Sequence, residues 1–287
     1  MDSLTVVVAD ATSATAMPVA DAIFRWLHII AGITWIGLLY FFNFINGHLA
    51  ATYDADSKKK VVPELMPRAL YWFRWGAAWT WFTGLILLVL VFWIADNGYM
   101  RSDFTSERAE DGTKLAPANM WIHISLTVTF LSVFLYDFFY KTSLGKNTRV
   151  ATIISFAYVA GFIFLMSKCG GMEYRAYNIH VGAMFGTIMA FNVWFRIWPA
   201  QQKIITAIKN GDAPNGDDVG LAGLRSKHNT YMSIPLIWTM ISGHHSGSGL
   251  WSGQYGISGE LWFLIMIALG WHIVFQLYKK SAKVQGF

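Results

Sequence analysis

Seven apolar stretches separated by shorter polar segments alternate along this chain of 287 residues. Most reach the roughly 20 residues that an α-helix needs to cross a hydrocarbon core about 30 Å thick. The pattern therefore predicts an all-α integral membrane bundle of about seven transmembrane helices. The sixth stretch is short and contains Pro235, so a kinked or partly unwound helix that lines a cavity would be tolerated there. The expected spans are 24–45, 72–95, 120–140, 150–167, 178–198, 229–244 and 259–278.

Lysine and arginine are distributed unevenly between the two sets of loops. Sixteen of the 22 basic residues fall in alternate loops and in the C-terminal tail, and the other six fall in the remaining loops or near the first helix. Cytoplasmic loops of membrane proteins carry the excess of positive charge. We therefore expect residues 1–23 to be a short extracytoplasmic segment, 24–278 the bundle and 279–287 a cytoplasmic tail.

The composition agrees with a membrane protein and limits the other classes. Charged residues make up 14% of the chain, against roughly 25% in an average soluble domain. The net charge of +5 comes from short loops and not from a basic stripe, so we expect lipid and not nucleic acid around the chain. One cysteine, Cys169, excludes an internal disulfide and a four-cysteine metal site, and no C-x-x-C-H motif is present for a c-type haem.

All eight histidines fall in or near the expected helices, where ionisable side chains are costly and are by default candidates for function. At about 1.5 Å per residue, they separate by depth into two groups. The expected outer group is His28, His123, His180, His244 and His245, and the looser inner group is His48, His228 and His272.

Two imidazoles on facing helices at one depth can hold the iron of a b-type haem. Glycines near these histidines, at positions 32, 37, 182, 186 and 270, would either make room for such a group or let helices approach closely. Arg25 and Arg175 are candidate partners for haem propionates. The alternatives are interhelical hydrogen bonds, a proton or substrate relay, and a non-haem metal at the His244–His245 pair.

Other polar residues lie toward the inner ends of the expected helices. Asp137, Asn43, Asn46 and Asn192 are at similar depth. They would form either a proton path or interhelical hydrogen bonds near the interface, and we favour the hydrogen bonds.

Three segments resemble the membrane domain of the bacterial cytochrome-c-type urate oxidases. They run from His28 to Gly37, from Asn178 to Trp198 and from His228 to His245, where the segment ends in Ser-Gly-His-His. The likeness covers roughly residues 22–278. It implies a multi-helix membrane domain that oxidises urate and passes electrons to cytochrome c, in the inner membrane of a bacterium.

The resemblance also leaves a choice between functions. Family members carry a cytochrome c domain after the membrane part, and this sequence has no C-x-x-C-H motif. We therefore expect either an oxidoreductase that reduces a separate cytochrome c, or a b-type cytochrome or structural subunit of a larger respiratory or photosynthetic complex without urate activity. A transporter is less favoured, because the histidines lie near the membrane faces and no paired broken helices occur at the midplane.

Overall fold

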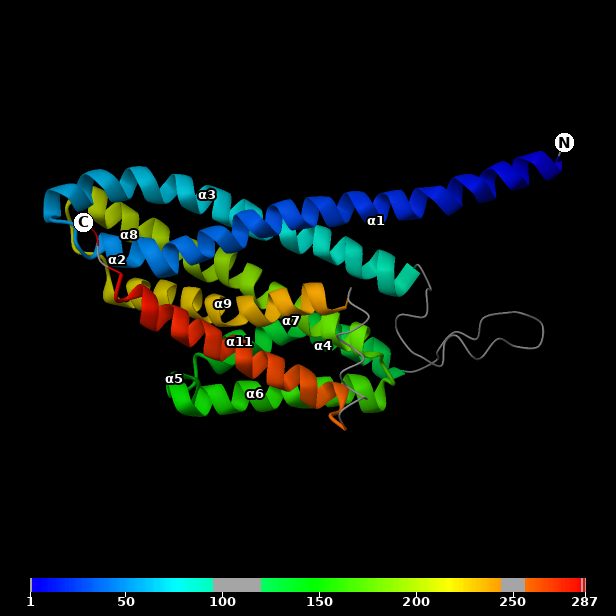
Figure 1. The fold of residues 1–287 in the computed structure, drawn as a ribbon. Helices are drawn as coiled ribbons and strands as arrows, with labels where there is room; N and C mark the ends of the chain where they lie inside the picture. Colours follow the sequence, from blue (N-terminus) through cyan, green and yellow to red (C-terminus); the bar gives the residue numbers. More distant parts are fainter. Residues whose placement is uncertain (1, 95–119, 244–255, 285, 287) are drawn as a thin grey trace.

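The computed structural model describes residues 2–94, 120–243, 256–284 and 286, with side chains from Met17 onward (Figure 1). These residues form helices and turns, and no strand occurs among them. Short π-helical segments, labelled η, continue four of the α-helices. The elements are α1 (Asp2–Tyr40), η1 (Phe41–Asn46), α2 (Gly47–Ala50), α3 (Ala55–Leu88), η2 (Val89–Ile94), α4 (Met120–Phe139), α5 (Ser143–Lys146), α6 (Thr148–Phe164), η4 (Leu165–Cys169), α7 (Tyr174–Asn192), η5 (Val193–Ile197), α8 (Trp198–Asn210), α9 (Gly216–Ser242) and α11 (Gly259–Ser281).

The prediction of an all-α membrane bundle is confirmed. Within the described residues, six helical segments are long and apolar enough to cross a membrane. They are Met17–Ala50, Ala55–Ile94, Met120–Phe139, Thr148–Cys169, Tyr174–Asn210 and Gly259–Ser281. The remaining predicted helix, the sixth along the chain, is α9, which is long enough but more polar. It stays helical through Pro235 and is not unwound there.

Helix α9 lies inside the bundle, and this position explains its polar sequence. It packs against α7, α8, α11 and α1 (Figure 1). Its buried side chains include a polar row that runs along the helix, so these groups face other helices and not lipid. The row consists of Arg225, Asn229, Thr230, Ser233, Thr239 and Ser242.

Helix α1 begins earlier than the hydropathy pattern predicts. It starts at Asp2 and continues through Pro18; its N-terminal turns project beyond the bundle, and its C-terminal part pairs with α3 (Figure 1). Close approach of the two helices depends on Gly76, because a Cβ at that position would lie 3.2–3.3 Å from atoms of Trp35. Trp35 is in turn one of the most deeply buried side chains of the protein.

Side-chain caps fix where several helices begin at the ends of the bundle. The Asp54 carboxylate accepts a hydrogen bond from the Ser57 backbone N–H at 2.6 Å, and that contact lowers the pKa of Asp54. Asn147 and Asn215 cap α6 and α9 in the same way. Gly211 ends α8 with a φ of +89°, a left-handed conformation that favours glycine.

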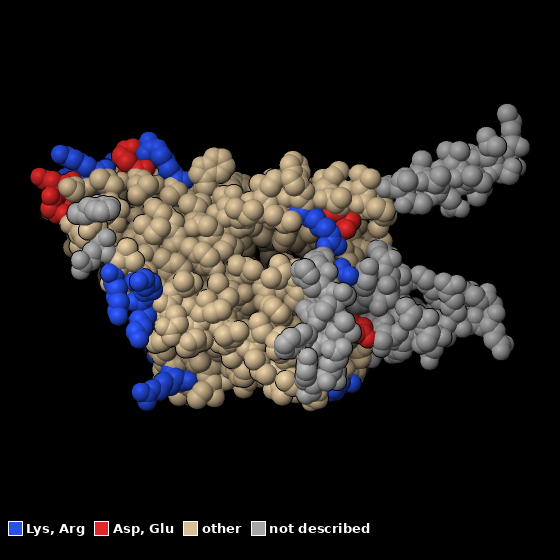
Figure 2. All heavy atoms as spheres, viewed as in Figure 1, with Lys and Arg blue, Asp and Glu red and all other residues tan. Residues whose placement is uncertain are grey.

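The charged residues are concentrated at the two ends of the bundle, with a broad uncharged band between them (Figure 2). The end that carries most of the lysine and arginine contains the α2–α3 connection, the α4–α6 connection, the α8–α9 turn and the C-terminus (Figure 1). We refer to it as the basic end. These segments are the ones that the sequence pattern placed together, so the fold agrees with the predicted grouping of the loops.

Candidate functional site

His180 is the most deeply buried histidine among the described residues. It lies two turns into α7 and is fully buried. Its Nδ1 lies 2.7 Å from the backbone oxygen of Ala176, so that nitrogen carries the proton and donates it. Nε2 has no hydrogen-bond partner among the described residues. A neutral imidazole with a fixed Nδ1–H and an open Nε2 is the form that binds a metal or haem iron.

Aromatic rings from η2 surround this imidazole. The ring centroids of Phe92 and Trp93 lie 6.0 Å and 6.4 Å from that of His180. Trp93 also contacts His123 of α4, with ring centroids 5.6 Å apart. Because a π-helical segment shifts the direction of its side chains relative to an α-helix, η2 allows these two neighbouring rings to point toward the same histidine. The structure therefore brings His123 and His180 into contact with one tryptophan.

The two arginines predicted as partners of haem propionates, Arg25 and Arg175, lie in different surroundings. The Arg175 guanidinium lies 5.8 Å from the Phe92 ring centroid and so belongs to the neighbourhood of His180. Arg25 makes an ion pair of 2.7 Å with Asp21, one turn earlier on α1. Of these two arginines, Arg175 is the one that contacts a neighbour of His180.

His28 lies deeper in the bundle than His123 and His180. Its Nδ1 is 3.1 Å from the hydroxyl of Thr83, and a Cβ at Gly84 would lie 2.9 Å from its ring. Thr83 precedes Phe92 by nine residues on a continuous helix, a rise of roughly 13 Å. His244 and His245, the remaining members of the predicted outer group, lie outside the described residues.

The three inner histidines have separate partners. His48 is 3.3 Å from the Ser281 hydroxyl, and His228 is 2.8 Å from the Tyr136 hydroxyl. His272 is exposed on α11. Its one side-chain hydrogen bond within the described residues is to Gln276 of the same helix, at 3.1 Å. In the described part of the chain, no three His, Cys, Asp or Glu side chains are grouped so that they could hold a metal ion.

The glycines near the histidines differ in whether helix packing requires them. A Cβ at Gly182 would lie 2.9 Å from the Cβ of Thr239, and one at Gly270 would lie 3.0 Å from the ring of Pro235. These two glycines therefore allow α7 and α11 to approach α9 closely. Gly37 and Gly186 have nothing within 4 Å of the added carbon, so close packing does not require them.

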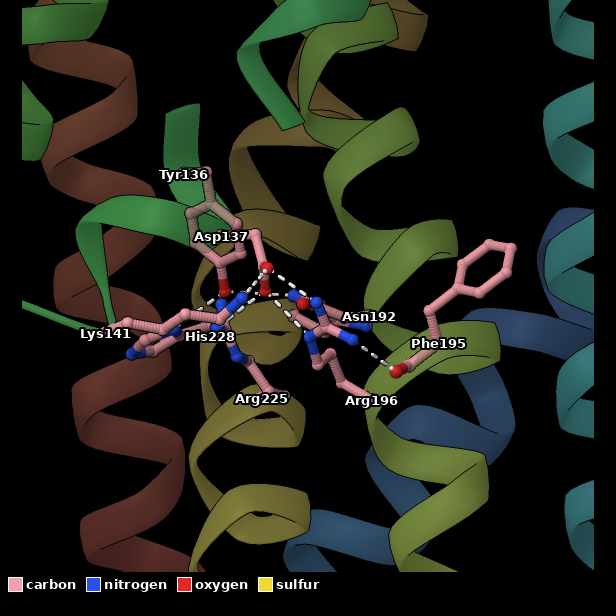
Figure 3. Close-up of polar contacts among 9 residues, drawn as sticks. Tyr136, Asp137, Lys141, Asn192, Phe195, Arg196, Arg225 and His228 are labelled. Carbon is pink, nitrogen blue, oxygen red and sulfur yellow. Dashed lines mark hydrogen bonds and ion pairs between the residues drawn. The ribbon is translucent and has the colours of Figure 1, made fainter. Parts of the chain in front are cut away.

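A second polar centre lies at the basic end, around Asp137 of α4 (Figure 3). Its Oδ1 accepts from Arg196 Nε at 2.8 Å and from Arg225 Nη2 at 3.0 Å. Its Oδ2 accepts from Arg196 Nη2 at 2.5 Å and from Lys141 Nζ at 2.7 Å. Side chains from α4, η5, α9 and the α4–α5 connection thus meet at one carboxylate, which we call the Asp137 cluster.

Neutral side chains extend this cluster into the bundle. Tyr136 accepts a hydrogen bond from Asn192 at 2.9 Å and also contacts His228 (Figure 3). Asn192 donates to Asn229 at 2.9 Å, and Asn229 donates to the backbone oxygen of Met189 at 2.9 Å. The structure therefore confirms the predicted interhelical hydrogen bonds of Asp137 and Asn192.

The sequence pattern did not single out Arg196 and Arg225 as members of this centre. Both lie within helical segments, and Arg225 is only 2% exposed. The available signal was the position of Arg225 one helical turn before Asn229, which puts both on one face of the helix. A buried arginine on a polar face needs a carboxylate partner, and Asp137 is the acidic residue of α4.

The model of the family described as urate oxidase N-terminal matches residues 52–283. That range covers most of the chain. The chain belongs to the urate oxidase N-terminal family. Comparison with curated proteins and comparison with solved structures gave no match.

The family assignment confirms the resemblance that the sequence motifs indicated. Within the matched range lie His180 with its aromatic neighbours, the Asp137 cluster and the segment from His228 to His245. The motif from His28 to Gly37 precedes the matched range. The urate oxidase N-terminal region therefore contains both polar centres described above, one toward each end of the bundle.

Proposed function

We propose that this chain is a membrane-bound oxidoreductase of the urate oxidase type that holds b-type haem and passes electrons to a separate cytochrome c. The family assignment supports urate as the electron donor, and the single observation that carries the haem proposal is His180. Its Nε2 is a buried nitrogen without a hydrogen-bond partner in the described part of the chain. A buried polar atom without a protein partner calls for another partner, such as a bound ligand or an ordered water.

The residues around His180 fit a haem ligand in their chemistry. The Ala176 carbonyl fixes the tautomer of the imidazole, which also makes Nε2 a better electron donor. Phe92 and Trp93 supply an apolar aromatic surrounding, and Arg175 supplies a cation for a propionate. When bound, the haem would supply a one-electron carrier. The second ligand in this proposal comes from His123, His244 or His245, because His28 lies deeper in the bundle than His180.

Electron balance defines the partner. A two-electron oxidation of one urate reduces two molecules of cytochrome c, because each accepts one electron. The end of the bundle opposite His180 carries most of the lysine and arginine, which favours the cytoplasmic side. In our proposal the His180 end therefore faces the extracytoplasmic side of a bacterial inner membrane, and cytochrome c would dock there.

The first test is a reduced-minus-oxidised spectrum of the detergent-purified protein, with a pyridine haemochrome assay. We expect a b-type spectrum in the wild type and loss of most haem in His180→Ala. The matched control is His272→Ala, because His272 is exposed and bonded only within α11 among the described contacts. Full haem content in His180→Ala, or no haem in the wild type, would contradict the ligand assignment.

The second test separates an enzyme from an electron-transfer or structural subunit. Purified protein is mixed with oxidised cytochrome c, and the absorbance of reduced cytochrome c is followed with and without urate. We expect urate-dependent reduction that His180→Ala abolishes and His272→Ala preserves. A haem-containing protein that shows no urate-dependent reduction would instead be a b-type cytochrome of a larger complex.

A further inference from the structure

We propose that the Asp137 cluster at the basic end binds an oxyanion, either the phosphate of an anionic lipid headgroup or a free inorganic phosphate. This site lies away from His180 and is independent of the proposed redox function. It combines a local excess of positive charge, a buried arginine with unused donors and a side that reaches solvent.

The charges of the cluster do not balance. Lys141, Arg196 and Arg225 each contact Asp137, and it is the only carboxylate that contacts any of the three within the described residues. Two positive charges therefore remain in excess beside a membrane interior. The two oxygens of Asp137 already accept four hydrogen bonds. Of the three cations only Arg225 is buried, and an unpaired charge is costly in a poorly hydrated site, so a second anion would stabilise the centre there.

Arg225 has N–H donors that no described residue uses. Its side chain is 2% exposed, and only Nη2 reaches Asp137. Nε and Nη1 have no hydrogen-bond partner in the described part of the chain. The guanidinium carbon lies 4.8 Å from the ring centroid of Tyr136 and 5.8 Å from that of Tyr140, so two aromatic rings hold its plane. A fixed guanidinium with unpaired N–H groups is suited to a planar or tetrahedral oxyanion.

Lys141 and Arg196 connect the buried arginine to the surface. Their side chains are 61% and 26% exposed. The cluster joins α4, η5 and α9 at the end of the bundle that carries most of the basic residues (Figures 2 and 3). Basic sites between helices at this depth are where anionic lipid headgroups bind in membrane proteins. A dissolved phosphate would meet the same donors.

The experiment compares Lys141→Gln with Lys146→Gln in nanodiscs. Both substitutions remove one exposed positive charge from the basic end, but only Lys141 contacts Asp137. Arg196 and Arg225 still neutralise Asp137 in Lys141→Gln, so this variant should fold. The melting temperature of each variant is measured in phosphatidylcholine nanodiscs. In one arm the fraction of phosphatidylglycerol is increased. In the other arm inorganic phosphate replaces chloride at constant ionic strength.

A lipid headgroup gives saturable stabilisation by phosphatidylglycerol, and a free oxyanion gives saturable stabilisation by phosphate in phosphatidylcholine alone. In either arm we expect half-saturation to require about tenfold more ligand for Lys141→Gln, from the loss of one charged contact, and no change for Lys146→Gln. Lys141→Arg should restore binding. The proposal is overturned if neither ligand stabilises the wild type more than chloride does, or if Lys141→Gln and Lys146→Gln respond equally.

Discussion

Replacing Asp137 by asparagine tests how much the ion-paired centre contributes to stability. The side chain is 8% exposed and accepts from three cations at 2.5–3.0 Å. Asparagine keeps the shape but removes the charge and turns one acceptor into a donor that faces other donors. Breaking a buried ion pair from one side costs about 3–5 kcal/mol. Because Lys141 and Arg196 are partly hydrated, we expect the lower limit, about 3 kcal/mol.

The assay is reversible unfolding in mixed micelles, followed by tryptophan fluorescence, with Asp218→Asn as the matched control. Asp218 pairs with Lys203, whose side chain is 70% exposed, so its loss should cost less than about 1 kcal/mol. In the double variant Asp137→Asn, Arg225→Met, removal of the buried unpaired cation should recover at least about 1 kcal/mol. If Asp137→Asn unfolds like Asp218→Asn, the centre is hydrated and the reasoning from buried charge is wrong.

Two further predictions concern helix packing. Gly182→Ala should lower the free energy of unfolding by about 1–3 kcal/mol, because the new methyl group meets Thr239 of α9. Its control is Gly186→Ala, one turn later, where the methyl group has open space and should be neutral or slightly stabilising. Equal effects of the two substitutions in the same unfolding assay would refute the role of Gly182. Arg74→Lys should cost about 0.5–1 kcal/mol, because the guanidinium lies 3.6 Å from the ring centroid of Trp198 and lysine cannot stack in this way. Arg68→Lys, at an arginine paired with Glu64 on the surface, is its control and should leave the unfolding midpoint unchanged.

The positions of the histidines along their helices could be predicted, but their neighbours could not. Counting residues gives the depth of His180 and His272, because the rise per residue of a helix is constant. Whether a side chain faces a neighbouring helix or lipid depends on the rotation of the helix about its axis. Helices that are apolar all round carry little information on that rotation. His180 is fully buried and His272 is exposed, and the sequence treats them alike.

The predicted depth of His28 shows a second limit. The sequence pattern started the first helix near residue 24, which put His28 close to the outer end. The structure starts α1 at Asp2 and places His28 opposite Thr83, deeper in the bundle. Hydropathy marks where lipid-compatible residues begin, and a helix can continue past that point because its backbone hydrogen bonds are satisfied locally.

The sequence by itself determined the all-α membrane bundle, the grouping of the loops at its two ends and the family. These properties depend on composition and on order along the chain, since a bilayer selects apolar helices and charge asymmetry orients them. Only the tertiary structure decided that the polar helix α9 lies inside the bundle, that η2 directs two aromatic rings at His180, and that Arg196 and Arg225 meet Asp137. Those contacts join residues far apart in the sequence, and helix packing, which no single helix specifies, brings them together.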